Sequence, residues 1–171
     1  LAFADLIVGV SNDAVNFLNS AIGSKVLSFK TIMIVASIGI FIGCVFSSGM
    51  MEVARKGIFN PGSFYFDEIM IIFMAVIITD ILLLDFFNTL GLPTSTTVSI
   101  VFNLLGASVV MSLIKIGASD SETLADIGNY INTDKAITII SGILLSVIIA
   151  FSVGAFVQWI SRIIFTFQFE K

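Results

Sequence analysis

The sequence has no histidine, a single cysteine and few charges, and each shortage excludes a class of function. Without histidine the chain lacks the usual proton shuttle, the serine–histidine nucleophile pair and most zinc sites. Cys44 is the only cysteine, so the chain forms no internal disulfide. No other nucleophile–base pair is visible. We therefore expect that the protein is not an enzyme.

Charged residues are the most informative shortage. They make up 12% of the 171 residues, whereas a soluble globular protein carries about 25%. The net charge is −4 and there is no basic face, which excludes a nucleic-acid partner. Residues 31–51, 86–114 and 136–161 contain no charge at all. A bilayer core about 30 Å thick needs about 20 apolar helical residues, and each run reaches that length.

The sequence therefore predicts an all-α membrane protein with about five transmembrane or re-entrant helical segments. These segments are expected over residues 1–22, 31–50, 69–87, 98–116 and 136–164. Lys25 and Lys30 place the first connector in the cytoplasm, which leaves the acidic loop 117–134 outside the membrane on the opposite side. The loop 88–97 has no Lys or Arg to report its side, so a re-entrant course stays open there. Because Leu1 is not an initiator and no basic leader is present, we expect a piece of a longer protein.

The first polar cluster at membrane depth lies in residues 11–20. On a helix, Asn12, Asn16 and Asn19 are spaced i, i+4 and i+7, so they share one face, and Asp13 is next to it. A carboxylate inside the bilayer costs at least about 2.5–3.5 kcal/mol, and we expect a bound cation to offset that cost. One carboxylate with amide and hydroxyl oxygens suits a hard cation such as Na⁺. The alternative is a helix interface held by amide hydrogen bonds.

The second polar cluster spans residues 88–97. Gly91 and Pro93 end the preceding helix, and Pro93 suits the first turn of a new one. The free N–H groups and the positive dipole end of that new helix favour an anion. The alternative is an ordinary capped loop between two helices. The hydroxyl groups that can follow the oxygens of a tetrahedral anion belong to Ser95, Thr96 and Thr97.

Two aspartates of the third segment, Asp80 and Asp85, have more than one interpretation. Either can complete a cation site or carry protons, and Asp85 can instead cap the approach to the loop. The residues that we expect to contact the ligating side chains, rather than the ions themselves, are Asn19, Ser20, Asp85 and Asn88.

Taken in order, the two clusters resemble the two signatures of the inorganic phosphate transporter (PiT) family. Residues 12–16, Asn-Asp-Ala-Val-Asn, followed by Ile-Gly-Ser at 22–24, are similar to the first signature. Residues 91–97, Gly-Leu-Pro-Thr-Ser-Thr-Thr, are similar to the second, and Arg-Lys-Gly-Ile at 55–58 also agrees with the family. The resemblance covers nearly the whole chain.

Three positions depart from the family pattern. Gly9 stands three residues before Asn12, where the family has glycine two residues before it. Asn19 occupies a usual glycine position. Val98 replaces a histidine, so any role of that imidazole is absent from this chain.

The resemblance implies a secondary active transporter built from two inverted repeats, of which residues 1–171 are the N-terminal one. It implies transport of inorganic phosphate with a coupled cation, Na⁺ or H⁺, and no other cofactor, in the plasma (bacterial inner) membrane. The implied partners are phosphate, the coupling ion, the lipid bilayer and the C-terminal inverted repeat of the same chain, and a homo-oligomer stays open. The matching motif positions assign Asn12, Asp13 and Asn16 to the cation site, with Asp13 binding Na⁺ in a sodium-coupled carrier, and Ser95, Thr96 and Thr97 to phosphate.

Other functions remain as alternatives. The chain can instead carry a related oxyanion such as sulfate, or be a non-transporting membrane subunit or assembly partner whose polar residues only join helices. An anion channel is less consistent, because a conducting pore is lined by rings of charge or carbonyls. Cation coupling has a physical motive, since bringing an anion into a negative cell costs about 2.3 kcal/mol per charge per 100 mV.

Overall fold

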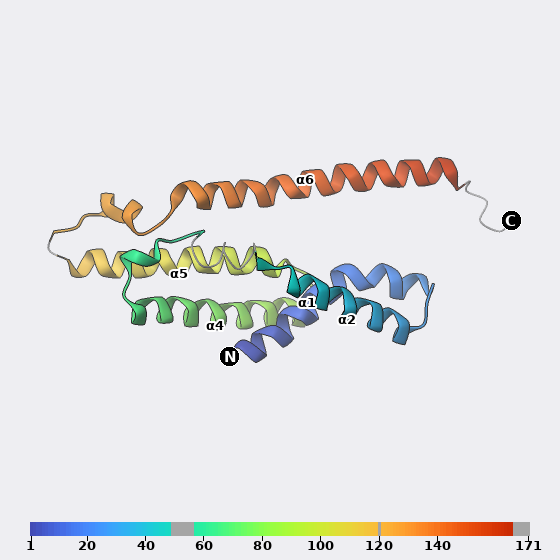
Figure 1. Cartoon of the computed structure of the whole chain (residues 1–171), viewed down its shortest axis with the longest axis horizontal. Helices are drawn as coiled ribbons and strands as arrows, with labels where there is room; N and C mark the ends of the chain where they lie inside the picture. The colour runs from blue at the N-terminus through green and yellow to red at the C-terminus, as the bar shows by residue number, and fades with distance from the viewer. Residues whose placement is uncertain (49–56, 120, 166–171) are drawn as a thin grey trace. The chain divides into compact units, whose positions relative to one another are not determined.

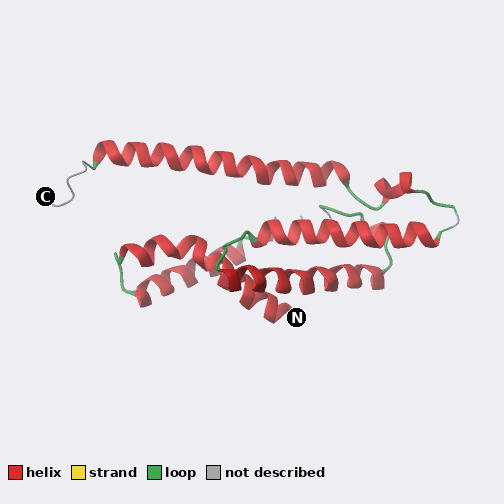
Figure 2. Cartoon of the chain, turned by 180° about the vertical axis from the view of Figure 1, so that it is seen from behind, coloured by secondary structure: helices red, strands yellow, loops and turns green. Residues whose placement is uncertain are grey.

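The computed structural model describes residues 1–48, 57–119 and 121–165, and the regular elements within them are helical (Figures 1 and 2). The long helices are α1 (Ala2–Ser24), α2 (Phe29–Val45), α4 (Phe66–Leu90), α5 (Thr96–Ala118) and α6 (Thr133–Ile164). Two short 3₁₀ helices are η1 (Pro61–Ser63) and η2 (Leu124–Asn129). Each predicted segment coincides with one long helix, which confirms the all-α class.

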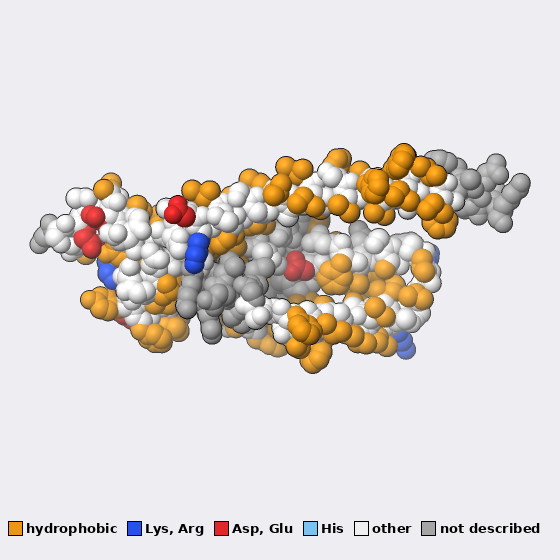
Figure 3. All heavy atoms as spheres, turned by 45° about the horizontal axis from the view of Figure 1, so that its top comes forward, with side chains coloured by type: hydrophobic (Ala, Val, Ile, Leu, Met, Phe, Trp, Pro, Cys, Tyr) orange, Lys and Arg blue, Asp and Glu red, His pale blue; other side chains and the backbone are white. Residues whose placement is uncertain are grey.

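Three of the described helices, α4, α5 and α6, are long and apolar enough to cross a membrane. Hydrophobic side chains follow the visible face of α6 along its length (Figure 3), and most of them are exposed. Such a surface needs lipid around it, so the chain is part of an integral membrane protein. Helix α2 is apolar but shorter, and α1 carries the first polar cluster. That α1 and α2 also cross the membrane stays a prediction.

The chain divides into two compact units, Leu1–Thr133 and Asp134–Lys171, the second formed by α6 and the residues after it. In the first unit α4 packs against both α5 and α1, and α1 also contacts α2 and α5. The buried face of α4 recurs every four residues and consists of Ile72, Val76, Asp80 and Leu84. An aspartate thus occupies one position of an otherwise apolar packing stripe.

The connection between α4 and α5 is shorter than the sequence predicts. Helix α4 ends at Gly91, whose φ of 68° lies in the left-handed region that glycine adopts without strain. Helix α5 begins only at Thr96, because the hydroxyl of Ser95 accepts the N–H of Val98 at 3.4 Å and caps the helix. The prediction that Pro93 lies in the first turn of the new helix is therefore wrong. Pro93 belongs to a tight, non-helical connection over residues 91–95.

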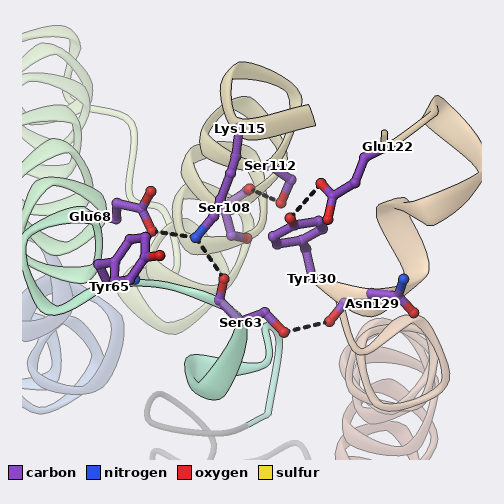
Figure 4. Close-up of polar contacts among 9 residues, drawn as sticks. All are labelled: Ser63, Tyr65, Glu68, Ser108, Ser112, Lys115, Glu122, Asn129 and Tyr130. Carbon is purple, nitrogen blue, oxygen red and sulfur yellow. Dashed lines mark hydrogen bonds and ion pairs between the residues drawn. The ribbon is translucent and has the colours of Figure 1, made fainter. Parts of the chain in front are cut away.

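The acidic loop 117–134 is folded onto the segment before α4, so it is more ordered than a simple extramembrane loop. Its backbone pairs with residues 58–60 around an isolated antiparallel bridge between Phe59 and Ile131. The hydroxyl of Ser63 donates to the carbonyl of Asn129 at 2.8 Å (Figure 4). Three charged residues of the sequence analysis, Asp120, Arg55 and Lys56, lie outside the described residues.

Lys115, near the end of α5, joins these parts in what we call the Lys115 cluster: Ser63, Tyr65, Glu68, Lys115 and Tyr130 (Figure 4). Its Nζ donates to Glu68 at 2.8 Å and to the carbonyl of Ser63 at 2.9 Å, and it lies 4.4 Å from the ring centroid of Tyr65. The hydroxyl of Tyr130 donates to Glu122 at 2.7 Å, and this bond raises the pKa of Tyr130 to about 12. The hydroxyl is therefore protonated at physiological pH, and its bond to Glu122 persists there.

Candidate functional site

The two predicted polar clusters meet where α1 lies against the connection between α4 and α5. Asn12 of α1 is 1% exposed, and both of its polar atoms are bonded. Its Nδ2 donates to Oδ1 of Asn88 at 2.7 Å, and its Oδ1 accepts the backbone N–H of Thr94 at 2.9 Å. The Nδ2 of Asn88 in turn donates to the carbonyl of Val8 at 3.3 Å. A buried amide must have partners, and here those partners fix the connection against α1.

The other two residues predicted for the cation site also contact this connection. Asp13 is half-buried, and its Oδ2 accepts the hydroxyl of Thr96 at 2.8 Å. Asn16 is exposed, and its Nδ2 donates to the carbonyl of Thr94 at 3.3 Å. The structure therefore brings the predicted cation residues and the predicted anion loop into one place. We call Asn12, Asp13, Asn16, Thr94 and Thr96 the junction.

Thr94 is the member of the junction that sequence reasoning missed. Both contacts use its backbone, the N–H toward Asn12 and the carbonyl toward Asn16. Because any residue supplies those groups, no side-chain pattern could have revealed them.

The three hydroxyl residues predicted for phosphate have different surroundings. Ser95 and Thr97 are exposed, and the Ser95 oxygen caps α5, as the alternative interpretation of a capped loop requires. Thr96 is half-buried and directs its hydroxyl to Asp13. All three stand at the N-terminus of a helix 23 residues long, where free N–H groups and the dipole favour an anion.

A depression of about 430 Å³ opens beside the junction and is lined by polar side chains of α1 and by Pro93. The depression is lined by Asn16, Asn19 and Ser20. Asn19 and Ser20, which were predicted to support the ligating side chains, therefore lie beside Asn16, which was predicted to bind the cation. Asn88 touches Asn12 directly. The remaining lining residue of the depression is Val15.

The structure does not bring the fourth predicted supporting residue, Asp85, to the junction. It is exposed on α4 and forms no hydrogen bond with the junction residues. Gly9 does lie close, since a Cβ there would stand 3.6 Å from Cγ2 of Thr96 and 3.9 Å from Cδ1 of Leu84. These are ordinary contact distances, so the shifted glycine of this sequence still allows α1 to approach α5.

A second polar group lies deeper along the same helices. Asp80 of α4 is 2% exposed, and its Oδ1 accepts the hydroxyl of Ser99 and Nδ2 of Asn103, the latter at 3.1 Å. Asp5 of α1 and Asp80 line one small cavity of about 160 Å³. The sequence pointed to Asp80 but not to its partners. The missed signals were the i, i+4 spacing of Ser99 and Asn103, and Asp5 seven residues before Asn12.

The chain is similar to a known protein family and to several known proteins. A profile described as the phosphate transporter family matches residues 9–170. Similar proteins provisionally named phosphate permeases are one from Mycobacterium bovis, 30% identical over 60% of this chain, one from Thermococcus kodakarensis, 31% identical over 58%, and one from Pyrococcus furiosus, 29% identical over 81%. The aligned parts are 19%, 25% and 31% of those relatives' lengths, so the chain spans less than a third of each. No solved structure matches significantly.

The family profile covers both polar clusters and nearly the whole chain, including the junction in which those clusters meet. The chain belongs to the phosphate transporter family.

Proposed function

We propose that this chain is the N-terminal repeat of a longer secondary active carrier that moves inorganic phosphate across the plasma membrane together with Na⁺ or H⁺. The observation that carries the proposal is the junction, above all the 2.8 Å bond from Thr96 to Asp13. It joins the one carboxylate of the first cluster to the N-terminus of the helix that would receive an anion. The cation site at Asp13 and the phosphate site at Thr96 would then be adjacent.

On the anion side, phosphate would bind at the start of α5. The first N–H groups of a helix have no partner within it, and they point toward the helix N-terminus. The hydroxyls of Ser95 and Thr97 stand in the same turn and can donate to phosphate oxygens, and that of Thr96, which donates to Asp13, would do so once a cation replaces it at Asp13. No Lys or Arg lies in residues 88–97, so the charge of the anion would be met by dipoles, hydroxyls and a bound cation.

On the cation side, Asp13 would be the principal ligand. Its Oδ2 is bonded to Thr96 and the amide nitrogen of Asn16 is bonded to Thr94, which leaves one oxygen of each side chain to face a cation. The oxygen of Asn12 already accepts the N–H of Thr94. Asn12 would therefore position the loop rather than ligate, which refines the role that the family resemblance implies. Hard cations such as Ca²⁺ and Mg²⁺ take about six oxygens, so further ligands would come from phosphate, water or the rest of the protein.

Thr96 would couple the two ions. A cation beside Asp13 would lie next to an anion at Thr96, and each charge would lower the cost of holding the other at membrane depth. Binding of one ion would then raise the affinity for the other by the same factor. A negative membrane potential would favour entry once the co-bound cations outweigh the charge of the phosphate.

The remainder of the carrier would come from elsewhere in a longer chain. Because the relatives are more than three times as long as the part that this chain matches, a C-terminal inverted repeat would complete the site. A homo-oligomer and a sulfate-carrying function are compatible with the same junction. A role as a non-transporting subunit would give no role to the exposed hydroxyl of Thr97, whereas the Ser95 hydroxyl caps α5 in either case.

The test is uptake of radiolabelled phosphate by the full-length protein in proteoliposomes, with and without Na⁺ and with excess sulfate as a competitor. We expect phosphate accumulation driven by a Na⁺ or H⁺ gradient and resistant to sulfate. Asp67→Asn is the matched control for aspartate-to-asparagine substitutions at the candidate sites. Asp67 is an exposed aspartate in the first turn of α4, far along the helix from the junction. Absence of labelled phosphate uptake under either gradient would reject the carrier, and inhibition by sulfate would make sulfate the preferred cargo.

A further inference from the structure

We propose that Asp5 and Asp80 form a carboxyl pair inside the membrane that binds one proton between them. The inference rests on the proposed function and deepens it, because it identifies H⁺ as a coupling ion and names the residues that carry it. Neither residue belongs to the junction.

Asp80 lies at the depth where a charge is most costly. It is 2% exposed on the buried stripe of α4. At 1.5 Å rise per residue it stands roughly 21 Å from the start of α4 and roughly 15 Å from its end. A carboxylate near the middle of a membrane span faces the interior of the protein and marks an ion or proton pathway.

Asp80 accepts donors from the neighbouring helix. Its Oδ1 accepts two donors from α5, the hydroxyl of Ser99 and the amide of Asn103. The same amide nitrogen lies 3.3 Å from the Ser99 oxygen, so the two donors are held as a pair. Hydrogen bonds that donate to a carboxylate stabilise its charge.

Asp5 has the opposite surroundings. Its Oδ1 is buried and has no hydrogen-bond partner in the described chain. Burial acts on this carboxyl, and so does the neighbouring carboxyl of Asp80, which is close enough for a hydrogen bond once one of the two carries a proton. Two carboxylates this near one another do not both ionise readily, and an apolar environment increases the cost. The two carboxyl groups would therefore hold one proton between them.

The cavity between them suits a proton better than a metal ion. Its volume is about 160 Å³, and its walls other than the two aspartates are apolar: Phe73, Val76, Ile77, Ile100 and Leu104. Within the described residues no three acidic, cysteine or histidine side chains converge to hold a metal. A hard cation takes about six oxygens, whereas a proton needs only one.

No basic side chain of the three packed helices faces this cavity within the described residues. The one charged residue of α5, Lys115, is paired with Glu68. The other acid of α1, Asp13, is bonded to Thr96. The remaining acids of α4 are Asp67, Glu68 and Asp85, and none of them lines the cavity. Within the described residues, Asp5 and Asp80 are thus the charged side chains that line this cavity.

The experiment uses the full-length protein in proteoliposomes without Na⁺ and compares two modes of transport. The first is exchange of labelled for unlabelled phosphate with no ion gradient, which needs phosphate binding and movement only. The second is accumulation of labelled phosphate driven by an imposed pH gradient. We expect Asp5→Asn and Asp80→Asn to retain exchange while their accumulation falls to the level seen without a gradient. The control Asp67→Asn should retain both modes.

The outcomes separate the two proposals. If the unmodified protein shows no phosphate exchange either without Na⁺ or with equal Na⁺ on both sides, the proposed function fails, and this inference fails with it. If exchange is present and Asp5→Asn still accumulates phosphate under the pH gradient, the carboxyl pair is wrong while the carrier stands. The carboxyl pair would also be wrong, with the carrier still standing, if accumulation by the unmodified protein required Na⁺ and did not respond to the pH gradient.

A second measurement covers the case in which a variant fails to fold or to exchange phosphate. The infrared spectrum of the unmodified full-length protein in membranes, near neutral pH, should contain the C=O band of a protonated carboxylic acid. Labelling aspartate with ¹³C should shift that band. A spectrum with no protonated aspartate near neutral pH would overturn the inference without reference to any variant.

Discussion

The two ends of the α4–α5 pair are both rich in polar groups, yet they differ in what those groups do. In the Lys115 cluster the cation has an anion, a carbonyl and three aromatic rings around it, all from the same chain. At the junction, Asn12 is fully bonded, but Asn16 is exposed and lines an open depression, and the nearby hydroxyl residues Ser95 and Thr97 are also exposed. The first arrangement is complete without a ligand. The second presents groups that a ligand can use.

This contrast teaches that polarity alone does not identify a ligand-binding residue in a membrane protein. The better indication is a donor or acceptor that no other group of the protein already uses. Lys115 would attract attention as a lone charge in an apolar helix, but its partners account for it. Asp13 has one such partner, Thr96, which bonds to Oδ2 and leaves Oδ1 available to a ligand. Substitutions at the two ends should therefore separate stability from transport.

The largest effect is expected from Asp13→Asn in the full-length carrier. The substitution keeps the size of the side chain and removes the charge that would hold the coupling cation. Gradient-driven phosphate uptake should be abolished, while membrane insertion and thermal stability stay close to those of the unmodified protein. Normal concentrative uptake by this variant would show that the cation binds elsewhere.

The next effect is expected from Thr96→Val, measured as phosphate affinity. A hydrogen bond to a charged group is worth about 1.5–3 kcal/mol, so losing one weakens binding by about ten- to a hundredfold. Valine keeps the shape of threonine, and the backbone donors of α5 should leave residual binding. The companion change is Thr97→Val, which removes an exposed hydroxyl of the same turn that is not bonded to Asp13. If neither valine variant alters phosphate affinity, the loop is structural and the anion binds elsewhere.

At the other end, Lys115→Met should reduce stability and leave phosphate affinity intact. It removes a half-buried ion pair and a cation–π contact, and we expect a loss of about 1–3 kcal/mol in the free energy of unfolding. Unfolding followed by heat or denaturant measures this loss. Glu68→Gln is the matched change on the partner and should cost less, because its amide still accepts a bond from Lys115. If Lys115→Met lowered phosphate affinity as much as Thr96→Val does, the Lys115 cluster would also contribute to phosphate binding, and the two ends would not differ in function.

The smallest effect is expected from Gly9→Ala. The added methyl group would meet Thr96 and Leu84 at ordinary contact distances. Alanine is also about 1 kcal/mol more favourable than glycine within a helix. Phosphate affinity should stay unchanged, and the free energy of unfolding should shift by at most about 1 kcal/mol. A large loss of transport would mean that α1 moves closer to α5 during the cycle than it does in this structure.

The helices could be predicted from the sequence because apolar runs and their breaks are local signals. Residues 69–87 were expected to be helical, and α4 extends a few residues beyond both ends because Glu68 accepts the N–H of Tyr65 and Gly91 closes the last turn. The start of α5 was misplaced at Pro93 because the cap depends on which hydroxyl, here that of Ser95, reaches a backbone N–H. The pattern of apolar residues predicts that a helix exists, whereas the capping hydrogen bonds decide the residue at which it begins or ends.

The candidate site was predictable in its members more than in its contacts. Asn12, Asp13 and Thr96 were identified as residues that should not occur at membrane depth without a function. That Asn12 would hold Thr94 by its backbone could not be predicted, because the contact joins residues 82 positions apart and uses no side chain of Thr94. Asp5 was missed for a related reason. Its meaning comes from Asp80, which lies on another helix.

The central claim is that cation and phosphate bind to one coupled site at the junction. The most direct test is the equilibrium affinity of the full-length protein for labelled phosphate, measured in the absence of any gradient at increasing concentrations of Na⁺ and, separately, of H⁺ with allowance for the titration of phosphate itself. We predict that one of these cations tightens phosphate binding and that Asp13→Asn removes the dependence. Phosphate affinity that is independent of both cations, or that depends on them equally in Asp13→Asn, would contradict the account.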